Sequence, residues 1–161
     1  MQITDPVTML TDYALGLENL FFSISIYLRM HSSNRVTGLL LLLGFLAEAL
    51  SGFAGGTFHG FATVVQSATR QSLWNLTLLS IGATIAFLVS AIHAADVHDE
   101  NGKWIVAAVV IGVAGLGVQS TGFRTHQPWN HNDYFHLIQI AAMYLFFRGA
   151  QHLKDRSHSP R

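Results

Sequence analysis

The chain has 161 residues, of which 50% are hydrophobic and 11% are charged, less than half the charged share of about 25% found in soluble domains. Nine Lys and Arg balance nine Asp and Glu, so the chain lacks the cationic field with which proteins bind nucleic acids. The absence of cysteine excludes disulfides, thiolate metal sites and thiol nucleophiles, so any metal must be held by His, Asp or Glu.

Five apolar stretches, each long enough to cross a bilayer as a helix, fill most of the chain. A hydrocarbon core about 30 Å thick requires about 20 mostly apolar residues. In chain order the stretches cover residues 13–30, 36–59, 73–93, 104–123 and 133–151. The connections between them are too short to hold a second domain, and a soluble bundle would need polar faces that the second and fourth stretches lack. The sequence therefore predicts an all-α fold in which residues 1–161 form one integral membrane domain of five transmembrane helices.

The basic residues predict the orientation of these helices. An odd number of spans puts the two termini on opposite sides of the membrane. Two basic residues, Arg70 and Arg124, lie on the side of the N-terminus, and seven lie on the side of the C-terminus: Arg29, Arg35, Lys103, Arg148, Lys154, Arg156 and Arg161. Because cytoplasmic loops carry the excess of Lys and Arg, we expect the N-terminus outside and the C-terminus in the cytoplasm of a plasma membrane or bacterial inner membrane.

The second stretch contains two ionisable residues on one helical face. Glu48 and His59 are eleven residues apart, which corresponds to about 16 Å along a helix, too far to bind one ion. A carboxyl group at this depth is costly, so Glu48, like Glu18 in the first stretch, is expected to face the bundle. Glu48 is then either a neutral group bonded to a neighbouring helix or a functional carboxylate.

The fifth stretch opens with the densest group of polar residues, HNDYFH. Asn132 and Asp133 precede His136 by four and three residues, so all three lie on one face of a helix, whereas His131 lies off that face. The predicted topology puts this turn on the same outer side as His59. Two histidines with a third ligand and an open position are typical of hydrolytic zinc sites. The alternative is that His59 and His136 are polar caps at the membrane interface.

Histidines and acidic residues also gather on the predicted cytoplasmic side, in the segment HAADVHDENGK. His93, Asp96 and His98 have spacings that resemble a metal motif. Short connections rich in Asp, Asn and Gly are typical of solvated loops. We therefore interpret this segment as a connection and not as a metal site.

The run GGTFHG at the end of the second stretch and HNDYFHLIQIAAMYLFFRGA in the fifth resemble the histidine motifs of the CREST superfamily of membrane zinc hydrolases, which includes alkaline ceramidases and progestin/adiponectin receptors. Those proteins are seven-helix bundles in which three histidines hold a catalytic zinc. The resemblance covers about a fifth of the chain and implies hydrolysis of a lipid amide. It matches His59 to the ligand of helix 2 and His136 to the second histidine of an HxxxH motif.

The sequence departs from the pattern of this superfamily at three positions. Asn132 stands in place of the first HxxxH histidine, with His131 one residue away. Gly55 stands where the superfamily has a serine, and Asn75 is the nearest polar residue to its conserved Asp. The chain also has five predicted helices in place of seven.

These observations predict a membrane protein with an outward-facing, histidine-rich site. The function that they favour is that of a zinc-dependent lipid hydrolase. Its metal ligands would be His59 and His136 with His131 or Asn132, and Asp133 would be the general base or would orient a ligand. One alternative is a subunit that holds haem b between His59 and His136. Another is a structural subunit whose glycine-rich helices pack against partner subunits or a second copy of the chain. Membrane lipid is the expected surrounding partner in each case.

Overall fold

The computed structural model describes residues 3–122 and 129–156 of the chain. It contains the helices α1 (Pro6–Leu28), α2 (Arg35–Phe61), α3 (Ser67–Ala94), α4 (Asp99–Ser120) and α5 (His131–Ala150), a 3-10 turn η1 (Ser32–Asn34), and the short strands β1 (Ala95–Asp96) and β2 (Lys154–Asp155). This confirms the all-α class and the five helices. Of the basic residues used above to orient the chain, Arg124 and Arg161 lie outside the described residues.

Helix α1 begins seven residues before the predicted apolar stretch, at residue 6 in place of 13. Its first turn is fixed by Asp5, whose side chain accepts a hydrogen bond from the backbone N–H of Thr8, and by Pro6 at the first helical position. Both features favour a helix start. The apolar stretch excludes this segment because polar residues interrupt it, yet the segment brings Thr8, Thr11 and Asp12 onto the helix.

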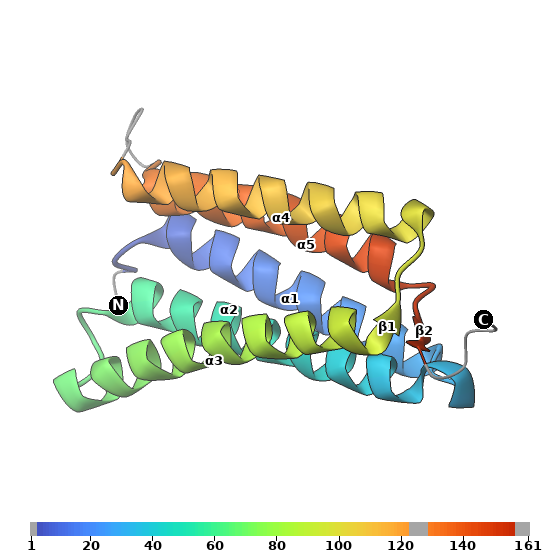
Figure 1. Ribbon diagram of the computed structural model, residues 1–161. Coiled ribbons are helices and arrows are strands. Elements are labelled where there is room, and N and C mark those ends of the chain that lie inside the picture. The colour runs from blue at the N-terminus through green and yellow to red at the C-terminus, as the bar shows by residue number, and fades with distance from the viewer. Residues whose placement is uncertain (1–2, 123–128, 157–161) are drawn as a thin grey trace.

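The five helices are arranged side by side in the order α3, α2, α1, α5, α4, as the packed pairs α2–α3, α1–α2, α1–α5 and α4–α5 require. Figure 1 shows α4 and α5 along one side, α1 in the middle, and α2 and α3 along the other. The row is curled, so that α3 and α4 border one cavity although they share no extended packing interface. The chain directions put the start of α1, the end of α2 and the start of α5 at one end of the bundle.

Close approach of α1 and α2 depends on glycine. A Cβ atom on Gly52 would lie 2.7 Å from the backbone oxygen of Asp12 and 2.7 Å from the backbone nitrogen of Gly16. Such contacts are too short for any side chain. Small residues of this kind allow membrane helices to pack backbone against backbone.

An aromatic cluster joins α1, α2 and α5 in the half of the bundle away from the start of α1. The rings of Phe22 and Phe147 are stacked at 4.2 Å with an interplanar angle of 9°, and Phe45 meets both of them edge-on. Phe45 is fully buried. This cluster and the aliphatic side chains around it form the core.

The two strands lie at the end of the bundle that is away from the start of α1. Antiparallel pairing aligns Ala95 with Asp155, which ties the end of α3 to the segment after α5. The Asp155 carboxylate also accepts hydrogen bonds from the backbone N–H groups of Val36 and Thr37, at 3.1 and 2.8 Å. It thereby satisfies free donors at the start of α2.

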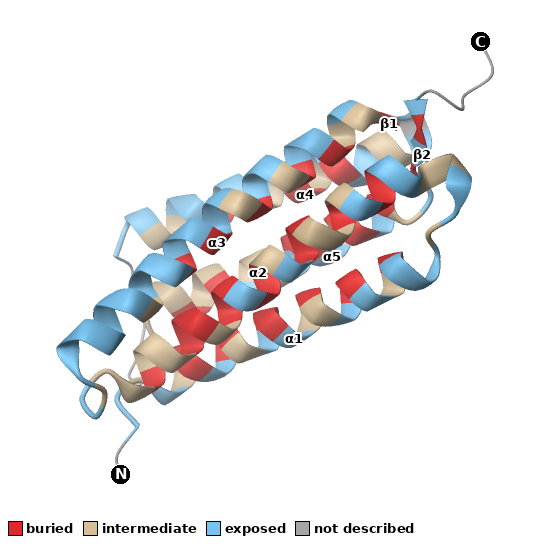
Figure 2. Ribbon diagram, turned by 90° about the horizontal axis from the view of Figure 1, so that it is seen from below, coloured by how far each residue is buried: buried red, intermediate tan, exposed pale blue. Residues whose placement is uncertain are grey.

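Three segments are long and apolar enough to span a membrane: Ser32–Phe61, Ser67–Ala94 and Glu100–Ser120. Only 28% and 17% of the apolar windows in the second and third of these are buried inside the bundle. Figure 2 shows exposed residues along α3 and α4, interrupted by few buried ones. Apolar faces of this extent favour contact with lipid, and they identify the chain as a membrane protein.

Candidate functional site

The site begins with a buried contact between α1 and α5. The Nε2 atom of His136 lies 3.2 Å from Oδ1 of Asp12, and its Nδ1 atom lies 3.0 Å from the hydroxyl oxygen of Thr11. Asp12 and His136 are 5% and 7% exposed. Nε2–H can donate to Asp12, and the Thr11 hydroxyl can share a proton with Nδ1 or donate to the backbone oxygen of Val7 or Thr8. The other carboxylate oxygen of Asp12, Oδ2, has no hydrogen-bond partner among the described residues.

A second set of contacts holds the first turns of α1 and α5 together. Asp133 is fully buried, and its Oδ1 accepts from the hydroxyl of Thr8 at 2.7 Å. Its Oδ2 accepts from the backbone N–H of Asn130 at 2.7 Å in a capping box. The Asn130 side chain in turn donates to Asp5 and to Thr8. This network fixes the register of α5 against α1 and so positions His136.

A cavity of about 510 Å³ lies beside the Asp12–His136 pair and is lined by all five helices. This volume is within the range of roughly 300–1,000 Å³ typical of pockets that hold one small ligand. The polar lining residues are Asp12, Glu48, Ser51, His59, Thr77, Thr84, Gln119, Asn132, His136 and Gln139. Lys and Arg are absent from the part of the lining that the described residues form.

The polarity of the cavity changes along its length. His59, Trp74 and Asn132 lie near the helix ends that meet at the start of α1, and they give this part of the lining its polar character. Residues towards the other end of the same helices, such as Ile92 and Phe146, are apolar. The site therefore combines a polar head region with an apolar channel.

The cavity opens between α3 and α4. Ile85 and Val89 on α3 are each 60% exposed, and Val109 and Val113 on α4 are 54% and 61% exposed, although all four line the cavity. The opening thus has apolar walls and faces the same side as the lipid-exposed surface.

The structure brings His59 and His136 to one cavity, at the same end of the bundle. Among the described residues, no group of three His, Cys, Asp or Glu lies close enough to hold an ion. His131 is half-buried, and its Nδ1 has no hydrogen-bond partner among the described residues. Asn132 lines the cavity and accepts a long hydrogen bond, 3.5 Å, from Gln119.

The sequence analysis missed Asp12, which is the carboxylate in contact with the His136 ring. Asp133, to which it gave the catalytic role, has both oxygens occupied in the α1–α5 network and is not part of the cavity lining. A Cβ atom on Gly55 would lie 3.2 Å from Oδ1 of Asp12. The absence of a side chain at Gly55 therefore provides room for a carboxylate from α1.

The two glutamates predicted to face the bundle differ in their surroundings. Glu48 is 5% exposed and lines the cavity, which confirms that it faces the interior of the bundle and not lipid. Glu18 is half-buried and does not line the cavity, and one of its oxygens has no partner among the described residues.

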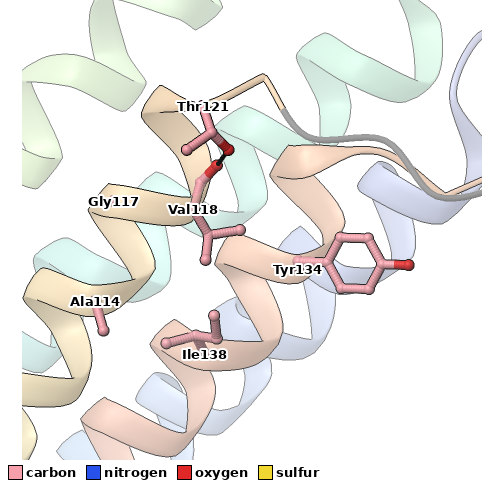
Figure 3. Close-up of a pocket in the computed structure, with 6 residues that line it drawn as sticks. All are labelled: Ala114, Gly117, Val118, Thr121, Tyr134 and Ile138. Atoms are coloured by element: carbon pink, nitrogen blue, oxygen red, sulfur yellow. Dashed lines mark hydrogen bonds between the residues drawn. The ribbon is translucent and has the colours of Figure 1, made fainter.

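A second, shallower pocket lies on the outer surface of the α4–α5 pair. Its six lining residues are Ala114, Gly117, Val118, Thr121, Tyr134 and Ile138. Figure 3 shows the side chains of Val118 and Ile138 between the two helices, while the ring of Tyr134 extends away from α4. None of the six is charged, and the polar side-chain groups among them are the hydroxyls of Thr121 and Tyr134.

A family model described as "Family of unknown function (DUF6962)" matches residues 7–97 and 84–155. The chain belongs to this family. The two matches overlap at the end of α3, where the chain passes from the first three helices to the α4–α5 pair. Searches of curated proteins and of solved structures find no significant match.

Proposed function

We propose that this chain is an integral membrane protein that binds one single-chain amphiphile in the cavity. The cavity itself carries the proposal, because a polar head region and an apolar channel of about 510 Å³ lie end to end within one bundle. The ligand's head would lie beside Asp12, His59 and His136, and its chain would extend between α3 and α4. Entry would be lateral, from the hydrocarbon phase, through the apolar opening between these two helices.

Substitution of two glycines on α4 tests this proposal. Gly112 lines the cavity, and its Cβ would lie 3.9 Å from Ala142. Gly112→Leu should therefore fill the channel and remove bound lipid that co-purifies with the chain, counted by native mass spectrometry. Gly117→Leu is the matched control, because Gly117 is outside the cavity lining and has open space at its Cβ position. Equal lipid content in the two variants would contradict a ligand in this cavity.

The proposal includes five spans with the N-terminus outside. It is supported by the three apolar segments and by the basic residues, most of which lie on the side of the C-terminus. Because the chain has no native cysteine, single cysteines can report the orientation in intact cells. A cysteine at Val64 should react with an impermeant maleimide, whereas one at Ser33 should not. The reverse labelling pattern would contradict an N-terminus on the outer side.

A zinc-dependent lipid amide hydrolase is the second candidate. The favouring observation is that His59, His136 and Asp12 border one cavity and that Oδ2 of Asp12 has no partner. Two histidines and a carboxylate are a common zinc donor set, although these side chains would have to draw closer than they lie in the structure. Bound zinc would supply Lewis-acid activation of an amide carbonyl and of water.

Metal analysis of the detergent-solubilised chain separates this candidate from simple ligand binding. One equivalent of zinc that is lost in His59→Ala and His136→Ala, but kept in His93→Ala, would support the hydrolase. Zinc content that is the same in all three variants would overturn it. A Soret absorption band in the purified protein would instead favour haem b held by the same two histidines.

A further inference from the structure

The charges around the cavity restrict the head group of the ligand. Asp12 and Glu48 are both at most 5% exposed and both line the cavity. The described lining offers no Lys or Arg to balance these carboxyl groups. An anionic head, such as a carboxylate or phosphate, would meet like charge in a low-dielectric site.

The hydrogen bonding of Asp12 specifies the complementary group. Its Oδ1 is occupied by the His136 ring, whereas Oδ2 is buried and has no partner among the described residues. A buried carboxylate oxygen without a donor is costly. The cavity beside it is the space from which a donor could come.

On these grounds, which rest on the proposed function, we propose that the cavity selects a single-chain lipid with a protonated amine head, held by Oδ2 of Asp12. An ammonium group provides three donors and a positive charge. One donor satisfies Asp12, and the remaining donors are available to Ser51 and Gln139, which line the same cavity. Glu48 lies deeper in the same lining, as a second carboxyl group near the cation.

Chain-matched ligands test this assignment in phosphatidylcholine nanodiscs. The probe is the fluorescence of Trp74, which lines the cavity, in a Trp104→Phe, Trp129→Phe background that leaves one tryptophan. Dodecylamine should give a saturable change with a Kd at least tenfold below that of dodecanoate. Asp12→Asn should weaken dodecylamine binding about tenfold and remove most of the preference. Glu18→Gln is the matched control, because it changes a carboxyl group on the same helix outside the cavity lining.

The outcomes distinguish this inference from the proposed function. Equal binding of the amine and the carboxylate would overturn the amine head and leave the amphiphile-binding cavity supported. A preference for the amine that survives in Asp12→Asn would overturn the role of Asp12. If neither ligand binds saturably, the proposed function itself fails. Nanodiscs with added phosphatidylethanolamine test the source of the amine, because competition by this two-chain lipid would overturn a single-chain ligand.

Discussion

The two halves of the contact between α1 and α5 are built from opposite chemistry. Near the start of both helices, the contact consists of hydrogen bonds among Thr8, Thr11, Asp12, Asp133 and His136. Further along, it consists of stacked rings centred on Phe22 and Phe147. Packing of apolar rings is sufficient to hold two helices together in a membrane. Ionisable groups at the same contact are costly and indicate function.

Within the polar half, the two aspartates differ in their hydrogen-bond partners and in their relation to the cavity. Asp133 has a donor on each oxygen and does not line the cavity, whereas Asp12 has one oxygen without a partner and lines the cavity. The difference separates a carboxylate that positions the helices from one that is available to a ligand. Substitutions in the apolar half, at the helix contact and at the two aspartates test these differences.

Phe45→Ala should produce the largest loss of stability. Phe45 is 0% exposed and touches the rings of Phe22, Phe146 and Phe147, so its removal leaves a cavity that costs about 3–5 kcal/mol. The free energy of unfolding in mixed detergent micelles measures this loss. Phe21→Ala is the control, since Phe21 is 63% exposed and its loss should have little effect. A similar loss in both variants would refute a core role for the aromatic half.

Gly52→Ala should have the next largest effect. The added methyl group would lie 2.7 Å from backbone atoms of α1, so the two helices would have to separate, at a cost of about 1–3 kcal/mol. Gly82→Ala provides the comparison, because open space surrounds the Cβ position of Gly82. We expect Gly82→Ala to leave the unfolding free energy unchanged or to raise it, since alanine is the better helix former. Equal destabilisation by the two variants would show that backbone contact does not limit the α1–α2 packing.

The five helices and the position of His59 and His136 at one end of the bundle could be predicted from the sequence. Apolar length fixes each helix, and chain direction fixes the end of the bundle to which each residue belongs. Asp12 could not be found in this way, because the hydropathy pattern started the first helix at residue 13 and left Asp12 in a tail. The available signal was local: Asp5 followed by Pro6 favours a helix start, which puts Thr8, Thr11 and Asp12 on one face.

The structural role of Asp133 was also hidden in the sequence. Asn130 followed three residues later by Asp133 is compatible with a capping box. The partner that completes the network is Thr8, 125 residues away. No local pattern predicts a contact of that separation. The histidine motif drew attention to the first turns of α5, where Asp133 and His136 lie.

Asp12→Asn and Asp133→Asn make the same chemical change at the two aspartates and give the sharpest test of the division between them. In Asp133→Asn, an amide NH₂ replaces one of two oxygens that accept from Thr8 and Asn130, and a buried donor loses its acceptor, at a cost of about 1–3 kcal/mol. In Asp12→Asn, the amide oxygen can still accept from His136, and the NH₂ group replaces an oxygen that had no partner. The unfolding free energy should therefore fall less in Asp12→Asn than in Asp133→Asn, while affinity for dodecylamine falls. If Asp12→Asn destabilises the protein as much as Asp133→Asn does, both aspartates are structural, and the distinction between a positioning carboxylate and a binding carboxylate is lost.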